Sequence, residues 1–324
     1  MEWYWIVLIC LIAVIGIVLL TSYICFRITY YVSDKNRRDA LAQPLPPGDI
    51  YVPHHETMRA WIAQMHAEPR RDVSVISFDG LTLRGYYYEY EPGAPVELMF
   101  HGYRGTSERD LCGGIQRCFA LKRNVLIVDQ RACGRSEGRV ITFGVNESRD
   151  LLTWVDFLRR EQGEQVPIIL TGVSMGAATV MIGTGHALPD NVIGVLADCG
   201  YTSAQDIIKK VIRDMHLPAD LLYPFVRLGG RLYGHFDVEE FSPLEAMSRC
   251  QLPIIFFHGE TDDFVPCEMS RRNYEACAAP KRLVTVPNAG HGLAFVVDQE
   301  GYLQKLDEFA KEYWNDKEQQ LLSK

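Results

Sequence analysis

The chain has 324 residues, of which 48% are hydrophobic and 23% charged, and its formal net charge is −8 at pH 7. A chain of this length holds one large domain or two small ones. The acidic balance and the lack of a basic stripe exclude the usual nucleic-acid binders, so we expect no nucleic-acid partner. Nine cysteines form no Cys-x-x-Cys pair or regular spacing, which disfavours a disulfide framework and a zinc site.

The first apolar segment predicts a membrane anchor over residues 1–30. Residues 3–26 contain no Asp, Glu, Lys, Arg or His, and about 20 apolar residues suffice to cross a bilayer. The acidic Glu2 and the lack of an Ala-x-Ala-like site disfavour the alternative, a cleaved signal peptide. Basic residues, beginning with Arg27, follow the span and none precedes it. The positive-inside rule then predicts a single-pass protein of the cell membrane whose catalytic domain is cytoplasmic.

Residues 31–70 are interpreted as a linker followed by an N-terminal helix. The run Gln43-Pro44-Leu45-Pro46-Pro47-Gly48 is incompatible with regular structure, whereas residues 54–62 have a helical composition. Three histidines in this region, His54, His55 and His66, raise the question of a metal site. No carboxylate at suitable spacing completes a coordination set, so we predict none.

The remaining residues, 71–324, alternate short apolar runs with helical segments. Asp79-Gly80 joins two strand-like runs and is typical of a hairpin. Continuous apolar runs such as 253–257 suit parallel strands buried on both faces. The alternation predicts an α/β fold with a doubly wound, mostly parallel sheet. Strands are expected at 96–100, 124–129, 166–171, 191–197, 253–258 and 281–286, and helices at about 108–122, 146–161, 175–187, 267–278 and 296–316.

Residues 201–250 interrupt this alternation, because they hold more chain than a single crossover needs. An insertion at this point is expected to lie over the carboxyl ends of the strands, where such sheets bind ligands. We interpret it as a small helical cap. Extra packing against the sheet edge is the alternative.

The segment Gly172-Val173-Ser174-Met175-Gly176 lies between a strand candidate and a helix candidate. Gly-x-Ser-x-Gly in this position is the nucleophile-elbow pattern, in which a sharp turn lifts the serine hydroxyl clear of the sheet. Such a turn leaves no room for a Cβ at residues 172 and 176, which explains the two glycines. Ser174 is therefore the candidate nucleophile.

A serine hydroxyl needs an adjacent base, which in turn is oriented by an acid. His291, in the loop after strand candidate 281–286, is the candidate base. Asp262, in the loop after strand candidate 253–258, is the candidate acid. All three groups then lie just beyond the carboxyl ends of strands, in the chain order Ser, Asp, His.

Three nearby residues offer alternatives. Asp263 is an alternative acid because it directly follows Asp262. His258 is expected to stabilise its own turn rather than to act as the base. Asp198, at the end of strand candidate 191–197, is expected to be a structural cap, although related folds place an acid at such a position.

Taken together, these motifs resemble the α/β-hydrolase superfamily over about residues 73–314. They are most similar to a bacterial branch described as serine aminopeptidase-like or acyl-ester hydrolases, in which a membrane anchor is frequent. One departure is visible, because Ala132 stands where the family has its first Gly. The matching segments are the elbow, His101-Gly102-Tyr103-Arg104-Gly105, Asp129-Gln130-Arg131-Ala132-Cys133-Gly134-Arg135-Ser136, and the loops that carry Asp262 and His291.

The resemblance implies an oxyanion hole and an acyl-enzyme mechanism. The backbone N–H groups of Tyr103 and Met175 would hold the tetrahedral oxygen. The chemistry needs no organic cofactor and no metal. Ser174, His291 and Asp262 would then form the catalytic triad of a serine hydrolase.

Within this class, an apolar cap and a membrane anchor favour a carboxylesterase acting on apolar acyl esters. A serine peptidase acting on short peptides and a thioesterase are the alternatives. A peptidase needs an acid that binds the substrate amine, for which the cap offers Asp237, Glu239 and Glu240. A catalytically silent, membrane-tethered binding protein is a hypothesis of another class, and the joint presence of triad and oxyanion residues disfavours it.

Overall fold

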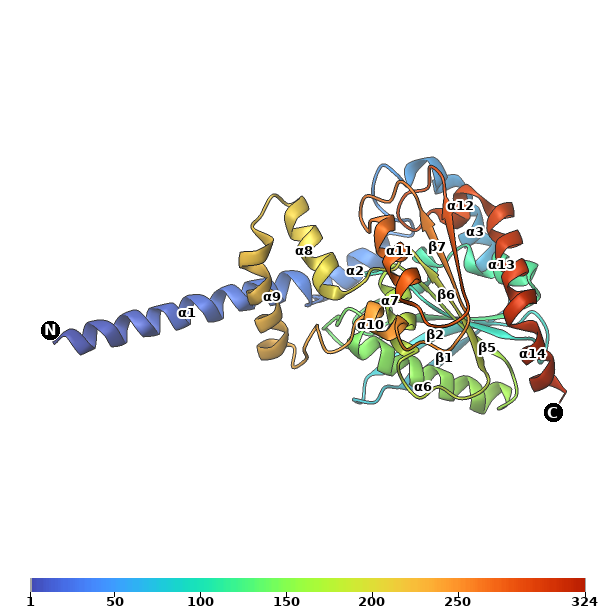
Figure 1. The fold of residues 1–324 in the computed structure, drawn as a ribbon, viewed down its shortest axis with the longest axis horizontal. Helices are drawn as coiled ribbons and strands as arrows, with labels where there is room; N and C mark the ends of the chain where they lie inside the picture. Colours follow the sequence, from blue (N-terminus) through green and yellow to red (C-terminus); the bar gives the residue numbers. More distant parts are fainter. Residues whose placement is uncertain (1, 324) are drawn as a thin grey trace.

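An eight-stranded sheet forms the centre of the protein (Figure 1). The computed structural model describes residues 2–323, and its strands lie in the order β1-β2-β4-β3-β5-β6-β7-β8. β2 pairs antiparallel with β1 and β4, and all other neighbours are parallel. The strands are β1 Arg70–Ile76, β2 Thr82–Tyr88, β3 Val96–Phe100, β4 Asn124–Asp129, β5 Ile168–Val173, β6 Val192–Asp198, β7 Ile254–Gly259 and β8 Lys281–Val286. The predicted doubly wound, mostly parallel sheet is confirmed.

Helices cover both faces of this sheet (Figure 1). They are α2 Asp34–Ala42, α3 His55–Ala67, α4 Ser107–Asp110, α5 Gly114–Ala120, α6 Val145–Gln162, α7 Met175–Gly183, α8 Ala204–Asp214, α9 Ala219–Tyr233, α10 Pro243–Met247, α11 Cys267–Ala276, α12 Ala294–Val297, α13 Gln299–Tyr313 and α14 Asn315–Leu322, with a 3₁₀ turn at Val52–His54. One hydrophobic cluster joins the sheet to α6, α7 and α10, and another joins it to α3 and α13. Because both faces are covered, β3, β4, β6 and β7 are buried along their whole length, as their apolar runs predict.

Two predicted helices are divided in the structure, and α2 and most of α14 lie outside the predicted helices. The segment 108–122 forms α4 and α5, with Gly113 between them. The segment 296–316 holds α12 and α13, because the Asp298 side chain caps α13 by accepting from the N–H of Gly301. In the predicted linker, the Ser33 side chain caps α2 by accepting from the N–H of Asn36. Short polar side chains thus start α2 and α13.

The first helix, α1 (Trp3–Thr29), is long and apolar enough to cross a membrane, a property that signal sequences share. Its N-terminal part projects away from the other elements, whereas its C-terminal part lies beside α9 (Figure 1). Ser22 and Phe26 in that second part are buried. The last turns of α1 therefore belong to the packed domain.

Candidate active site

Ser174 lies in a strained turn between β5 and α7. Its backbone angles are φ 56° and ψ −117°, a conformation that non-glycine residues adopt only where the surrounding structure imposes it. A Cβ on Gly172 would collide with the backbone of Gly176, and one on Gly176 would collide with the carbonyl of Phe100. The two glycines thus permit the turn, as the elbow pattern predicts.

The structure brings Ser174, His291 and Asp262 together from three separate loops. Nε2 of His291 lies 2.9 Å from Oγ of Ser174. Nδ1 of the same ring lies 2.7 Å from Oδ2 of Asp262. Because a carboxylate only accepts hydrogen bonds, Nδ1 carries the proton and Nε2 is free to accept the serine proton.

Asp262 is buried and fully hydrogen-bonded. Its Oδ1 accepts from the backbone N–H groups of Phe264 (3.0 Å) and Val265 (2.8 Å). Burial favours the neutral acid, but hydrogen bonds from His258 and His291 outweigh it and lower the pKa of Asp262 to about 2. The group is therefore a carboxylate throughout the neutral range, as the orientation of a catalytic histidine requires.

Within residues 2–323, neither His258, in β7, nor the side chain of Asp263, in the loop after it, is hydrogen-bonded to Ser174 or His291. The ring of His258 is buried, with Nδ1 2.7 Å from Oγ of Ser270 and Nε2 2.8 Å from the carbonyl oxygen of Val265. These contacts hold its own turn, in line with the structural role expected for it. The side chain of Asp263 is exposed, and its neighbour Asp262 is the acid that contacts His291.

The loop after β3 lies directly against the serine. A Cβ on Gly102 would be 3.8 Å from Oγ of Ser174. The N–H of Tyr103 takes part in none of the hydrogen bonds found within residues 2–323. Met175 is the first residue of α7, so its N–H has no partner within the helix. Both amides are therefore available to an oxygen bound beside Ser174.

Comparison with known proteins identifies the family of the chain. The family model described as the alpha/beta hydrolase family matches residues 98–304. The chain belongs to this family. It is 29% identical over 187 residues to the uncharacterized protein YqkD of Bacillus subtilis, and the match covers 57% of this chain and 61% of YqkD.

Solved structures share the fold of this chain. The Pyrococcus furiosus esterase Pf2001 superimposes with a TM-score of 0.63 at 21% identity, over 77% of this chain and 95% of the esterase. A Pyrococcus horikoshii acylaminoacyl peptidase gives a TM-score of 0.57 at 17% identity, over 75% of this chain and 41% of the peptidase. At these identities the likeness concerns the fold alone.

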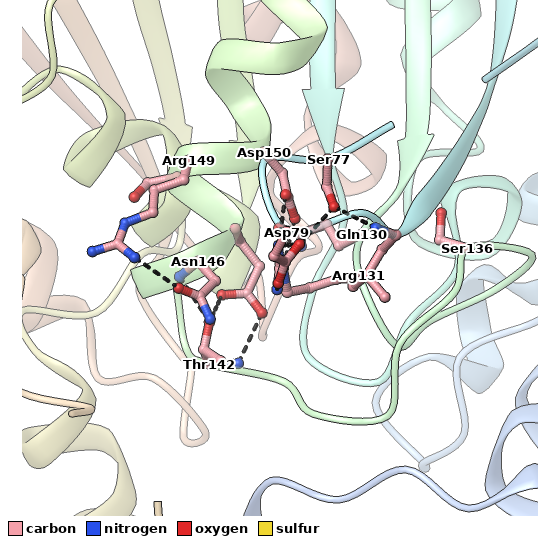
Figure 2. Close-up of polar contacts among 12 residues, drawn as sticks. Ser77, Asp79, Gln130, Arg131, Ser136, Thr142, Asn146, Arg149 and Asp150 are labelled. Carbon is pink, nitrogen blue, oxygen red and sulfur yellow. Dashed lines mark hydrogen bonds and ion pairs between the residues drawn. The ribbon is translucent and has the colours of Figure 1, made fainter. Parts of the chain in front are cut away.

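The loop after β4 supports the loop that contains His101 and Gly102. Gln130 binds the buried His101 twice, through its backbone N–H to Nε2 (3.0 Å) and its side-chain amide to the carbonyl oxygen (2.6 Å). Figure 2 shows how the next residue is fixed: the guanidinium of Arg131 bridges Asp150 at 2.7 Å and Asp79 at 2.9 Å. Ala132 has a φ of 63°, which explains why the family has glycine at this position.

A cavity of about 600 Å³ opens at Ser174 and His291. Much of its wall comes from segments that the sequence motifs did not assign to the site: residues 46–51 of the predicted linker, and α3, α5 and α12. Apolar side chains from these segments include Ile50, Met58, Trp61, Phe295 and Val296. No motif marks them, because they are ordinary loop and core residues whose position depends on the fold.

The insertion at residues 201–250 is helical, as predicted, and its hydrophobic cluster includes Met175 and Val265, which both follow strand ends. Among the described residues, the lining of the cavity includes none from this segment. α8 and α9 instead share a hydrophobic cluster with Phe26 and Tyr30 at the end of α1. The cap acids are also engaged elsewhere: Asp237 and Glu239 bind Arg227, and Glu240 binds Arg149.

Asp198 lies in the wall of the cavity, at the end of β6. Its Oδ2 accepts from the hydroxyl of Tyr302 at 3.1 Å. Its Oδ1 is buried and has no hydrogen-bond partner within the described residues. Burial raises the pKa of Asp198 to about 6. The contact with Tyr302 fits the structural role expected for this residue, and the second oxygen remains without a partner within residues 2–323.

One group of potential metal ligands coincides with the site. Ligand atoms of Cys199, Asp262 and His291 lie within 4.8 Å of one another. The carboxylate and the imidazole already bind each other, and burial raises the pKa of the Cys199 thiol well above its usual value. A protonated thiol is a poor metal ligand. Within residues 2–323, His54, His55 and His66 form no such group.

Proposed function

We propose that the protein is a membrane-anchored serine hydrolase that cleaves carboxylic esters with apolar acyl groups. The observation that carries this proposal is the continuous chain of contacts from Ser174 through His291 to Asp262, at 2.9 and 2.7 Å. The two free amides beside the serine support it further. A catalytically silent fold has no use for a strained serine with an aligned base.

In the proposed mechanism, Oγ of Ser174 attacks the ester carbonyl carbon while its proton passes to Nε2 of His291. The amides of Tyr103 and Met175 donate to the oxyanion of the tetrahedral intermediate. His291 then gives the proton to the departing alkoxide, which leaves as the alcohol and yields the acyl-enzyme. Water attacks next, and its proton passes through His291 to the departing Ser174 Oγ. Asp262 orients the ring and stabilises the imidazolium.

The acyl side of the substrate is expected to be apolar. The cavity wall contains Met58, Trp61, Met99 and Phe295. Each methylene that leaves water for such a wall contributes about 0.8 kcal/mol.

A series of p-nitrophenyl esters tests this assignment. With the full-length protein in detergent, kcat/KM should rise by about fourfold for each methylene from acetyl to hexanoyl, the ratio that corresponds to about 0.8 kcal/mol. Trp61→Ala should reduce the increase in kcat/KM per methylene, because it removes apolar surface from the cavity wall. A rate that is independent of acyl length in the unchanged protein would contradict an apolar acyl site.

Two adjacent carboxylates allow a matched test of the triad acid. Asp262→Asn should lower kcat by about 10³- to 10⁴-fold, because an amide cannot hold His291 in the required tautomer or stabilise its charged form. Asp263→Asn should leave kcat within about twofold, because the Asp263 side chain is exposed and the contact with His291 comes from Asp262. The reverse pattern in steady-state kinetics would transfer the role to Asp263.

A peptidase remains the second candidate function, and Asp198 is the observation that favours it. A buried carboxylate oxygen without a partner, in the cavity wall, is suited to bind a substrate ammonium group. Aminoacyl p-nitroanilides compared with acyl esters separate the two functions, and acyl thioesters in the same assay separate a thioesterase, which would use the same triad.

Retention of α1 in the mature protein is part of the proposal. Phe26 and Tyr30 contribute to the same hydrophobic cluster as α8 and α9. The hydroxyl of Tyr103 also donates to the carbonyl of Thr29 at 2.7 Å. Cleavage of α1 would remove these contacts from the domain, which supports an anchor over a signal sequence. The basic residues after α1 support a cytoplasmic catalytic domain.

A further inference from the structure

α9 crosses the end of α1 in close contact. A Cβ on Gly229 would lie 3.0 Å from Cβ of Phe26 and would collide with the carbonyl of Ser22. The hydroxyl of Tyr233 donates to the carbonyl of Leu19 at 3.1 Å. The glycine therefore lets the two helices approach, and the crossing point lies near residues 19–26 of α1.

α9 also carries an apolar stripe on the side opposite its buried face. Tyr223, Val226 and Gly230 are buried on one side of the helix. The stripe residues follow at intervals of four, three and four, so they share one face. Leu221 is 63% exposed and Leu232 42%, and the two residues between them are partly exposed. The α9 stripe consists of Leu221, Phe225, Leu228 and Leu232.

The direction of the α9 stripe follows from the arrangement of the helices. α8 lies between α9 and the sheet, so α9 is the layer nearest the projecting part of α1 (Figure 1). The buried face of α9 belongs to the cluster that includes α8. The opposite face therefore points away from the sheet, towards the side from which the N-terminal part of α1 extends. Met215 and Leu217, exposed in the turn between α8 and α9, add to this apolar surface.

The dimensions of α1 place one surface of the bilayer at the level of the α9 stripe. Residues 3–17 of α1 are exposed along their length and contain no charged side chain. From residue 3 to residue 20 the helix rises about 27 Å, close to the hydrocarbon thickness of a bilayer of about 30 Å. Tyr23, in ring contact with Tyr233 at 5.2 Å, follows at the depth where interfacial aromatic residues lie. Arg213 and Arg231, exposed on the α8–α9 hairpin, suit the headgroup region.

We propose that the α8–α9 hairpin is a membrane-docking element that lies in the bilayer interface, with the α9 stripe among the acyl chains. The proposal rests on the membrane anchor of the proposed function, and it adds a second, lateral contact with the lipid surface. The occupant of the stripe is the bilayer, because α9 packs against α1 next to its exposed apolar segment and the stripe faces the side on which that segment projects. A contiguous exposed apolar patch of this kind is unusual for a face in water.

Docking of the hairpin would also affect the loop that carries Tyr103 and Arg104. Besides the bond from Tyr103, the guanidinium of Arg104 donates to the carbonyls of Ile28 (2.8 Å) and Tyr31 (3.2 Å). The end of α1 is thus held by the same loop that presents the Tyr103 amide beside Ser174. Docking of the hairpin fixes α1 and this loop relative to the bilayer as one unit.

Photolabelling from the lipid tests the proposal on the full-length protein. The protein is reconstituted in vesicles of phosphatidylcholine and phosphatidylglycerol that contain a phosphatidylcholine with an acyl-chain diazirine. After irradiation, lipid adducts are mapped by mass spectrometry. Adducts are expected in residues 3–20 and in residues 215–232, and not in α13. The double variant Leu221→Glu, Leu232→Glu should lose the adducts at 215–232 and keep those of α1. Ile76→Glu, equally exposed at 63% but on β1, is the matched control and should keep both.

Each other outcome overturns the proposal in a distinct way. Adducts in α1 without adducts at residues 215–232 would support the membrane anchor but reject the proposal that the hairpin docks on the bilayer. An absence of adducts from both would reject the anchor itself, while ester hydrolysis in detergent reports separately on the proposed activity. A concentration-dependent dimer in detergent that the double variant abolishes, with no lipid adducts at 215–232, would assign the α9 stripe to a second copy of the chain.

Discussion

Replacement of Ser174 by alanine is expected to lower kcat for ester hydrolysis by about 10⁴- to 10⁶-fold, because the nucleophile of the acyl transfer is lost. The residual rate would come from the oxyanion donors, Tyr103 and Met175, which the substitution leaves in place. The fold should persist, because Ser174 contributes only its hydroxyl to the contact with His291. Hydrolysis of p-nitrophenyl hexanoate by the full-length protein in detergent, together with thermal unfolding, measures both effects.

A fluorophosphonate probe gives an independent readout of the same residue. It reacts with serines activated by a base, so labelling should be present in the unchanged protein and absent from the Ser174→Ala variant. Ser248→Ala is the matched control, since Ser248 is exposed at the end of α10 and donates only to the carbonyl of Glu245. It should keep full labelling and full activity. Hydrolysis that survives in Ser174→Ala at the original rate would reject the proposed mechanism.

The sheet and the three loops at its carboxyl edge follow from local patterns in the sequence. Strands buried on both faces are mostly apolar, so β3, β4 and β7 can be located from runs of apolar residues, even though β3 also buries Glu97. The elbow is equally local, because the collisions that a Cβ would cause at positions 172 and 176 arise from the turn itself and from the adjacent strand. Asp262 and His291 could then be placed from the rule that such groups follow strand ends.

The cavity wall and the position of the insertion depend on contacts between distant parts of the chain. Trp61 and Phe295 stack at 5.3 Å to form one wall, and no local pattern in either segment indicates the other. The composition of residues 201–250 predicts helices but not their partner. That partner is the end of α1, about 200 residues earlier, where Gly229 admits the backbone of Ser22. The need for glycine at position 229 can be recognised only when the positions of both helices are known.

The second large effect is expected from Asp198→Asn. Burial raises the pKa of Asp198 from 3.8 to about 6, so between these values the native state binds its proton more tightly than the unfolded chain. Stability therefore falls as the pH rises from 4 to 6, by about 3 kcal/mol in total, because a difference of one pH unit between the two pKa values corresponds to about 1.4 kcal/mol. Asparagine cannot ionise. The variant should be more stable than the unchanged protein by about 3 kcal/mol at pH 7.5 and about equally stable at pH 4, as the same linkage requires. Urea unfolding at the two pH values measures this.

Glu97 is the control, because it is a buried carboxylate whose ionisation stabilises the native state. Burial opposes its ionisation, but Arg117 and Arg123 outweigh this and lower the pKa of Glu97 to about 2. Its charge therefore stabilises the native state at neutral pH, and that stability is lost as the pH falls from the ordinary pKa of a glutamate towards 2. Glu97→Gln should accordingly destabilise the protein at pH 7.5, where Asp198→Asn stabilises it.

The contrast between these two carboxylates bears on function. Glu97 has charged partners, whereas Asp198 keeps an unpartnered oxygen in the cavity wall at the expense of stability. Groups held in this way are characteristic of sites that bind substrate. If the substrate carries an ammonium group, Asp198→Asn should lower kcat/KM for aminoacyl p-nitroanilides and leave that for hexanoyl esters unchanged. A stabilised variant with unchanged rates on both would show that Asp198 binds neither substrate, and the apolar ester would remain as the substrate that the cavity supports.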